Sequence, residues 1–283
     1  MSRTQTCPNC PGSAVKRVFT IRQGNRVVRC TRCDLQFAEL YPDFQEADAG
    51  IYTAAYFRKA IEEQQKRQRI FSKLLAELES VLHRKGRLLD VGAGEGTLLQ
   101  VATEQGWQAE GIDVASAMVR HVREELGLVM HHGVLEDVAL PERCYDAVIM
   151  NHVLEHVKNP VTALQKISRL LRKDGAVRIE VPNLASLSSG AKNVQSRLKL
   201  KRNPWKHYST EHHFWFFTPR TLKTTLETAG LTALRLEAPA RQWSERGLLD
   251  RLLDSVYGRT RWGGHIVAYA RPAGSHSPRG RVP

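Results

Sequence analysis

A glycine-rich turn beside a carboxylate is the part of this sequence best suited to chemistry. Gly92, Gly94 and Gly96 alternate directly after an apolar run that contains Asp90, in the segment LLDVGAGEG. Glycine permits positive φ angles and lets a ligand approach the main chain. The helix predicted to begin at Thr97 adds free N–H groups and the positive end of its dipole. This combination predicts a site for an adenosine-type cofactor.

The spacing of the glycines separates two kinds of cofactor. A dinucleotide fingerprint requires a glycine at the position of Thr97. Asp90 would repel a pyrophosphate, but it suits a ligand that carries an ammonium group and a sulfonium, as S-adenosylmethionine does. Asp113 lies 17 residues after Gly96, at the end of the next predicted strand, where such folds place a carboxylate on the ribose hydroxyls.

A second polar segment, NHVLEHVKNP, follows the fourth predicted strand. Asn151, His152, Glu155 and His156 therefore lie beside the predicted cofactor crevice and are candidate site residues. Histidine side chains titrate near neutral pH, so we expect His156 to accept a proton and Glu155 to orient it. The alternative is that either histidine only shapes the loop.

Aromatic and histidine side chains gather in residues 184–217, after the fifth predicted strand. The cluster comprises Trp205, His207, Tyr208, His212, His213, Phe214, Trp215, Phe216 and Phe217. A segment inserted at this point is placed to form a lid or a wall of the substrate site. The HxxxxHH spacing would also suit a metal ion. We expect instead that these histidines hydrogen-bond within the wall and that His212 contacts the substrate.

Four cysteines near the N-terminus are spaced as metal ligands. They form two C-x2-C pairs, made by Cys7, Cys10, Cys30 and Cys33. Four thiolates suit one tetrahedral Zn²⁺ and predict a zinc ribbon over residues 1–40. So small a module buries too little core to fold without its metal. Because four cysteines leave no open coordination position, we expect the zinc to be structural. Cys144 is expected to be a buried strand thiol.

Apolar and amphipathic segments alternate along the rest of the chain. The predicted strands are 86–91, 108–113, 128–132, 144–150, 175–181, 231–237 and 265–270, and the predicted helices are 97–105, 116–126, 160–172, 219–229 and 246–256. Asn159-Pro160 and Thr218-Pro219 mark helix starts, and Gly175 and Gly230 follow predicted helix ends. The pattern predicts an α/β fold with a Rossmann-like, doubly wound, mostly parallel seven-stranded sheet.

The flanking segments complete the predicted organisation. Residues 41–84 read as a helical packing segment, because apolar residues between 51 and 83 recur at helix-face spacing. The main domain spans 85–270 and contains the insertion 184–217. Residues 271–283 are expected to be a disordered tail.

Charge is distributed unevenly along the 283 residues. The formal net charge is +13, with +6 in residues 1–34, −4 in 35–183 and +11 in 184–283. Basic ends indicate an anionic partner or substrate: a nucleic acid, a phosphorylated or nucleotide-linked small molecule, or an anionic membrane surface. No apolar run approaches the ~18 residues of a membrane span, and MSRTQTCPNC lacks the apolar core of a signal peptide. We therefore expect a cytoplasmic, reducing location.

These motifs together resemble the class I S-adenosylmethionine-dependent methyltransferases. The resemblance is carried by LLDVGAGEG, Asp113, VLEDV, YDAVIMNHVLEHVKNP, VRIEVPN and HHFWFFTPRTLKTTLETAGL, over residues 84–270. The branch most similar in motif is the bacterial group related to the ubiquinone-pathway O-methyltransferase. The N-terminal zinc ribbon resembles, more loosely, that of bacterial members that modify sugars, polysaccharides or natural products. Asp34 departs from the glycine that is frequent in such knuckles.

The resemblance implies a role for each matching position. Asp90 and Gly92 would lie near the methionine moiety, and Gly94 and Gly96 would leave space for the cofactor. The remaining cofactor-binding positions would be Asp113 at the ribose, Leu135 and Glu136 beside the adenine, and Asn151 with His152 on the methyl side. Val114, next to Asp113, is also expected to bind the cofactor. Val134 replaces an acid found in many relatives, so adenine contacts would depend on backbone groups and Glu136.

Two classes of acceptor remain open from the sequence. The leading hypothesis is a small-molecule methyltransferase that acts on a sugar, a lipid-linked compound or a secondary metabolite, with an anionic or sugar-containing acceptor. The rival is an rRNA or tRNA methyltransferase that binds RNA through the zinc ribbon and the basic C-terminal segment. Against the rival, the fourth strand lacks the Asn-Pro-Pro-aromatic and Pro-Cys motifs of many base methyltransferases.

Overall fold

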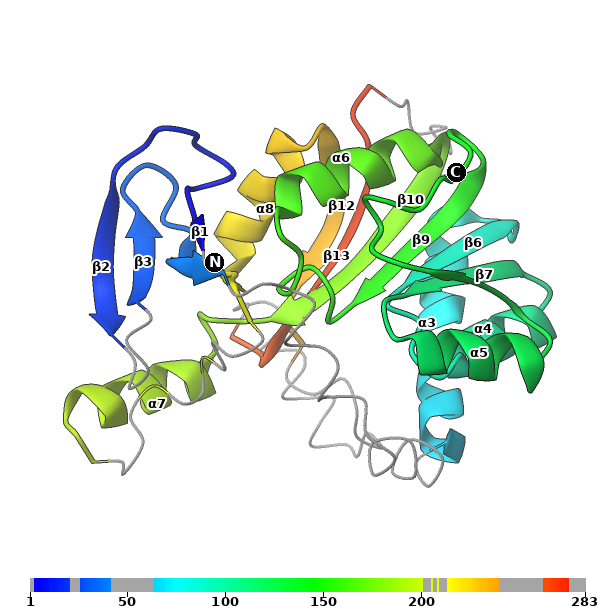
Figure 1. The fold of residues 1–283 in the computed structure, drawn as a ribbon, viewed down its shortest axis with the longest axis horizontal. Coiled ribbons are helices and arrows are strands. Elements are labelled where there is room, and N and C mark those ends of the chain that lie inside the picture. The colour runs from blue at the N-terminus through cyan, green and yellow to red at the C-terminus, as the bar shows by residue number, and fades with distance from the viewer. Residues whose placement is uncertain are drawn as a thin grey trace, which may run out of the picture.

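Seven strands form the central sheet, which is the number that the alternating pattern predicts (Figure 1). The structure is a computed structural model that describes residues 3–20, 26–41, 64–200, 205, 208, 213–239 and 262–274. The strands are β6 (Arg87–Val91), β7 (Gln108–Asp113), β8 (Val129–His132), β9 (Tyr145–Asn151), β10 (Leu171–Pro182), β12 (Leu231–Glu237) and β13 (His265–Pro272). Their spatial order is β12-β13-β10-β9-β6-β7-β8, and only β13 runs antiparallel to its neighbours. The predicted Rossmann-like, mostly parallel sheet is confirmed.

Helices cover both faces of this sheet. They are α3 (Gln64–Leu82), α4 (Thr97–Glu104), α5 (Ser116–Glu124), α6 (Pro160–Leu170) and α8 (Pro219–Thr228). Apolar residues of α6 and α8 pack with one face of the central strands, and those of α3 and α4 pack with the other. The predicted starts of α6 and α8 are confirmed, because the side chains of Asn159 and Thr218 cap them.

Three local expectations were wrong. The helix predicted over 160–172 ends at Leu170, because Leu171 already pairs with Tyr145 as the start of β10. Gly175 lies inside β10 rather than at a helix end, and a Cβ atom there would lie 2.9 Å from the carbonyl oxygen of Tyr145. Close approach of two strands therefore explains this glycine. Cys144 is half-buried rather than buried.

Other expectations fall partly or wholly outside the described residues. The helical segment is described only from residue 64, and the predicted helix 246–256 is outside. The last strand continues to Pro272, two residues beyond its predicted end, and nothing is described after residue 274.

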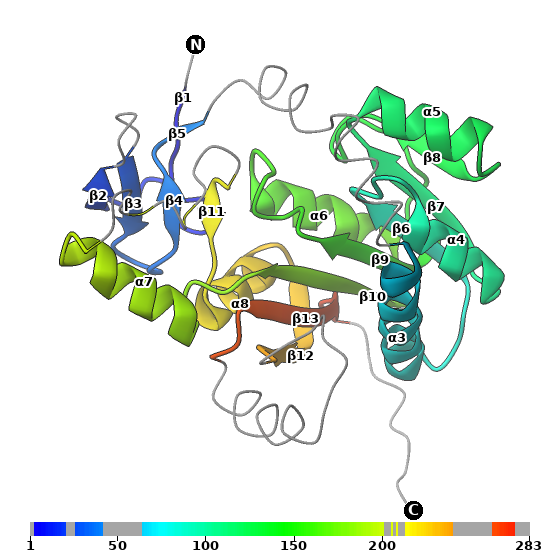
Figure 2. The same cartoon turned by 90° about the horizontal axis from the view of Figure 1, so that it is seen from below.

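The N-terminal cysteine segment and the insertion share a second sheet. The N-terminal strands are β1 (Arg3–Thr4), β2 (Val15–Thr20), β3 (Arg26–Cys30), β4 (Gln36–Ala38) and β5 (Leu40–Tyr41), and the insertion contributes α7 (Leu187–Arg197) and β11 (Trp215–Phe216). The order β11-β4-β3-β2 places β11 beside β4 (Figure 2). We refer to this four-stranded sheet as the joint sheet.

The first cysteine pair also contacts the main domain. The side-chain amide of Asn9 donates a hydrogen bond to Oγ1 of Thr225 on α8, at 3.0 Å. Asp34 adopts a φ of 66°, the left-handed conformation that explains the usual preference for glycine at this position.

Within the part of the chain that the structure describes, no helix has the length and apolarity needed to cross a membrane.

Candidate functional site

The glycine turn has the backbone that its sequence predicts. Gly92, Gly94 and Gly96 have φ angles of 76°, 54° and 80°, all in the region that side chains disfavour. A Cβ atom on Gly92 would lie 2.5 Å from Cγ2 of Val153, so this position also lacks room for a side chain. The turn is tied to the next strand, because the amides of Gly92 and Ala93 donate to the carbonyl of Ile112.

Asp113 holds the far side of this turn. Its two carboxylate oxygens accept hydrogen bonds from the amides of Gly94, at 2.9 Å, and Ala115, at 2.8 Å. Burial raises the pKa of Asp113, although these backbone hydrogen bonds oppose the shift. These contacts tie the glycine turn to the end of the second strand.

Three carboxyl groups lie around the turn: those of Asp90, Glu95 and Asp113. Asp90 is buried, and burial together with the charges of Asp113 and Glu95 raises its pKa well above the usual value. A cation placed here would relieve the repulsion and favour the ionised form of Asp90. A cationic ligand would therefore gain attraction here as Asp90 ionises.

Arg67 and Glu95 were missed by sequence reasoning. Arg67 on α3 forms an ion pair with Glu95 in the glycine turn, and Thr97 Oγ1 donates to the same carboxylate at 3.0 Å. The contact joins the N-terminal packing helix to the turn. The helical pattern of residues 64–82 does not predict this ion pair, because the pairing depends on the packing of α3 against α4.

The segments expected at the adenine meet at the ends of β7 and β8. The amide of Gly133 donates to the carbonyl of Asp113, and a ring nitrogen of His132 lies 3.0 Å from the carbonyl oxygen of Val114. Leu135 is buried, and burial raises the pKa of Glu136. Lys166 Nζ donates to the carbonyls of Glu136 and Val138 at 2.9 and 2.7 Å. These contacts fix the segment that would form one wall of a cofactor pocket.

His152 lies between two buried carboxylates at the end of β9. Its Nδ1 is 3.3 Å from Oε1 of Glu155, and its Nε2 is 3.6 Å from Oε1 of Glu180. Burial acts to lower the pKa of His152, but the hydrogen bonds and charges of the two glutamates outweigh it and raise the pKa to about 10. The ring is therefore protonated at neutral pH. This places a positive charge between the two carboxylates.

Asn151 and Glu180 are held by a buried arginine. Arg178 on β10 donates to Oδ1 of Asn151, and its Nη2 lies 3.0 Å from Oε2 of Glu180. The Arg178 side chain is only 1% exposed, so its charge depends on these partners. A signal was present in the sequence: VRIEVPN carries two charged residues on the same face of an apolar strand.

His156 contacts the insertion through His213. The two rings meet edge to face with centroids 4.8 Å apart, and His156 Nε2 lies 3.9 Å from Oε1 of Glu155. One ligand atom from each of these three residues lies within 4.8 Å of the others. The sequence favoured His212, which lies outside the described residues, whereas the neighbouring His213 is the insertion histidine that the structure places beside His156.

The carbonyl of Glu155 anchors the start of β11. It accepts hydrogen bonds from the amides of Phe214, at 2.9 Å, and Trp215, at 3.3 Å. Trp215 Nε1 also donates to the carbonyl of Val157 at 2.7 Å. The loop after β9 and the joint sheet are thus connected by three hydrogen bonds.

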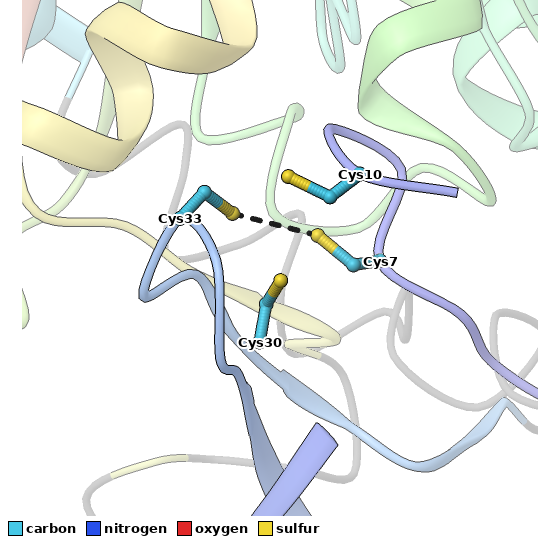
Figure 3. A group of neighbouring side chains, drawn as sticks. All are labelled: Cys7, Cys10, Cys30 and Cys33. Atoms are coloured by element: carbon cyan, nitrogen blue, oxygen red, sulfur yellow. Dashed lines mark hydrogen bonds between the residues drawn. The ribbon is translucent and has the colours of Figure 1, made fainter. Parts of the chain in front are cut away.

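The four N-terminal cysteines gather as predicted. Their side chains point toward one another (Figure 3), and all four sulfur atoms lie within 4.8 Å of each other. The Sγ atoms of Cys7 and Cys33 are 3.5 Å apart, and all four residues are buried. The structure contains no disulfide among these thiols.

The chain belongs to the methyltransferase-domain family. The family model described as a methyltransferase domain matches residues 37–236, which is more than half of the chain. This confirms the resemblance noted in the sequence, and it covers both the glycine turn and the loop after β9.

Two similar proteins with known names are also methyltransferases. The ubiquinone biosynthesis O-methyltransferase of Maricaulis maris is 28% identical over 159 residues, which is 54% of this chain and 60% of that protein. The enzyme of the same name from Dinoroseobacter shibae is 28% identical over 197 residues, which is 66% of this chain and 74% of that protein. The chain therefore spans less than two thirds of the Maricaulis relative.

A solved structure shows the same fold. The 1,6-didemethyltoxoflavin-N1-methyltransferase of Burkholderia thailandensis aligns with a TM-score of 0.54 and 16% identity, and covers 91% of this chain and 99% of its own. That structure contains S-adenosylhomocysteine. At this identity the likeness concerns the fold alone.

Proposed function

We propose that this protein transfers a methyl group from S-adenosylmethionine to a small-molecule acceptor. The observation that carries the proposal is the glycine turn surrounded by the buried carboxylates Asp90 and Asp113. Positive charge on the ligand would be stabilised there, whereas a pyrophosphate would be repelled. Membership of the methyltransferase-domain family supports the same assignment.

The residues present fit this cofactor. Asp90 would accept a hydrogen bond from the ammonium group of the cofactor. The main chain of residues 92–96 would lie against its methionine moiety. Asp113 is held by two amides, which leaves other lone pairs of its carboxylate for ribose hydroxyls. Leu135 and Glu136 would face the adenine. When bound, the cofactor supplies a reactive methyl group on a positively charged sulfur.

On the acceptor side, His156 would take the proton that a hydroxyl acceptor loses. Glu155 lies beside it and would stabilise the protonated ring, and His213 would hold it in orientation. His152 would serve as a fixed cation that keeps Glu155 and Glu180 ionised, because both carboxylates have lowered pKa values despite their burial. Alignment of the reactants and exclusion of water by the aromatic wall would supply much of the rate.

The names of the relatives and the charge of the insertion support the proposed acceptor class. Two relatives are named for ubiquinone biosynthesis, which favours a small molecule over RNA. The basic residues of the insertion favour an anionic, sugar-containing or lipid-linked acceptor. RNA recognition would rest on the zinc ribbon and the basic C-terminal segment, and neither of the two relatives is named for RNA.

We also propose that Cys7, Cys10, Cys30 and Cys33 hold one structural Zn²⁺. Tetrahedral zinc with bonds of about 2.3 Å sets sulfur atoms about 3.8 Å apart. The sulfur atoms of Cys7 and Cys33 are 3.5 Å apart, and all four lie within 4.8 Å of one another. Four buried thiols with no disulfide between them would otherwise leave the interior of the module without a strong interaction.

The proposal is tested by methyl transfer from labelled S-adenosylmethionine into cell-extract fractions. One half of each fraction is treated with nuclease before the protein is added. We expect label in small organic molecules from both halves, and no label with a variant that carries Asp113→Ala. Label confined to RNA and lost after nuclease treatment would contradict the small-molecule assignment.

A further inference from the structure

Helix α7 exposes its apolar side to solvent. Leu187, Ala191, Val194 and Leu198 follow one another at helical spacing and lie on one face of the helix and its last turn. Leu187, Val194 and Leu198 are 49%, 55% and 63% exposed. A surface helix of a globular protein ordinarily buries such a stripe, so the amphipathic pattern of α7 is inverted.

The side of α7 that packs against the protein is polar. Ser196 is buried, and its Oγ accepts a hydrogen bond from the amide of Trp205 at 3.0 Å. Near the start of the helix, Ser189 Oγ donates to the carbonyl of Asn183 at 3.2 Å. The helix is therefore held by specific polar contacts, which leaves its apolar stripe free for another surface.

The position of α7 makes this stripe accessible. Both views show the helix at the edge of the molecule, next to β2 and β3 and away from the central sheet (Figure 1, Figure 2). The amide of Leu187 donates to the carbonyl of Trp262, whose side chain is 49% exposed. An exposed tryptophan thus lies near the beginning of the stripe.

Positive charge accompanies the apolar stripe. Residues 184–210 contain six basic residues and no acidic residue. Three of the six, Lys192, Arg197 and Lys199, lie on or directly after α7 and are exposed. Exposed leucine, valine and tryptophan next to unopposed basic residues are typical of helices that lie in the headgroup region of an anionic membrane.

We propose that α7 docks this protein on anionic lipid surfaces. The helix would lie in the membrane plane, with Leu187, Val194 and Leu198 at the boundary between headgroups and acyl chains. Lys192, Arg197 and Lys199 would contact lipid phosphates. RNA would also attract the basic residues, but phosphate contacts do not use an apolar stripe. This inference goes beyond the proposed methyl transfer and does not depend on it.

Vesicle co-sedimentation tests the proposal on the full, metal-loaded chain. The vesicles contain phosphatidylcholine alone or with about 30% phosphatidylglycerol, at ~100 mM salt. We expect binding only to the anionic vesicles. The double variant Val194→Asp with Leu198→Asp should lower partitioning by more than about tenfold, because two buried side chains are lost. Lys192→Glu with Lys199→Glu should lower it by a similar factor.

Two controls make the outcome decisive. Val129→Asp alters an equally exposed valine on β8, which is 56% exposed, and should leave partitioning unchanged. The milder pair Val194→Ser with Leu198→Ser, checked by circular dichroism, should give an intermediate loss. Equal binding by the double aspartate variant, an equal loss in Val129→Asp, or binding to tRNA with none to vesicles would each overturn the proposal.

Discussion

Trp215 lies opposite Phe37 in the antiparallel pairing of β11 with β4, and their ring centroids are 5.4 Å apart. This pair joins the N-terminal cysteine segment to the insertion. Because the amide of Trp215 also donates to the carbonyl of Glu155, the same pair connects the cysteine cluster to the loop that carries His156. The joint sheet therefore supports the loop that we propose for the acceptor side, while the glycine turn belongs to the central sheet.

Replacement of Cys30 by serine should impair the acceptor side of the site and leave cofactor binding intact. We expect loss of bound zinc and a decrease of about 100-fold in methyl transfer, since small displacements of reacting groups are costly. The Kd for S-adenosylmethionine should stay within about twofold, because distant sites act independently. Metal analysis and calorimetry measure these quantities, with Cys144→Ser as the matched control. If the affinity for S-adenosylmethionine fell together with the zinc content, cofactor binding would depend on the cysteine cluster, and the prediction would be wrong.

The ion pairs of His152 should make stability fall at alkaline pH. Its pKa of about 10 in the folded protein lies above the ordinary 6.5, so its contribution is complete below pH 6.5. That contribution is lost as the pH rises through 10. The free energy of unfolding of the wild type should therefore decrease toward that of His152→Gln over this range. Denaturant titrations of both proteins at several pH values measure it, and a constant difference between them would contradict the pairing.

Cofactor binding should drive the ionisation of Asp90. Because burial raises the pKa of this carboxyl well above its usual value, a cationic ligand must displace a proton to gain the full attraction. We expect the affinity for S-adenosylmethionine to rise with pH while Asp90 ionises. The variant Asp90→Asn should bind about 10- to 100-fold more weakly, as for loss of a charged hydrogen bond.

Calorimetry in two buffers of different ionisation enthalpy measures the proton directly. The observed binding enthalpy should differ between the buffers for the wild type and agree for Asp90→Asn. Equal proton release by both proteins would show that another group titrates.

His156→Ala should lower turnover without weakening cofactor binding. Removal of a positioned proton acceptor costs about 10²- to 10⁴-fold in rate. Single-turnover methyl transfer and calorimetry together separate the two effects. His121→Ala, which changes a histidine on α5, serves as the control and should retain full activity. Wild-type turnover by His156→Ala would leave the loop histidine with a structural role alone.

Local patterns predicted most of the central sheet. The glycine turn, the caps at Asn159 and Thr218 and the cysteine pairs each depend on residues close together in the chain, so their spacing carries the information. The pairing of Trp215 with Phe37 and the contact of Arg67 with Glu95 depend on tertiary packing between distant segments. Nothing in the local sequence specifies such partners.

Two charged residues inside β10 were a sequence signal for buried polar partners that was overlooked. Arg178 and Glu180 break an apolar strand, and their burial requires partners, which the structure supplies as Asn151 and His152. The carboxylates of Glu155 and Glu180, acting against burial, make His152 a cation. Its pKa could not be read from a sequence, because it depends on two carboxylates that arrive from different elements.

Titration calorimetry of the folded, metal-loaded protein tests the central claim most directly. S-adenosylmethionine and S-adenosylhomocysteine are compared with NADH, and Asp113→Ala is the control. We predict that both sulfur ligands bind with a Kd on the order of 1–100 μM, that Asp113→Ala weakens both, and that NADH gives no heat. Saturable binding of NADH, with none of either sulfur ligand, would contradict the assignment of the glycine turn.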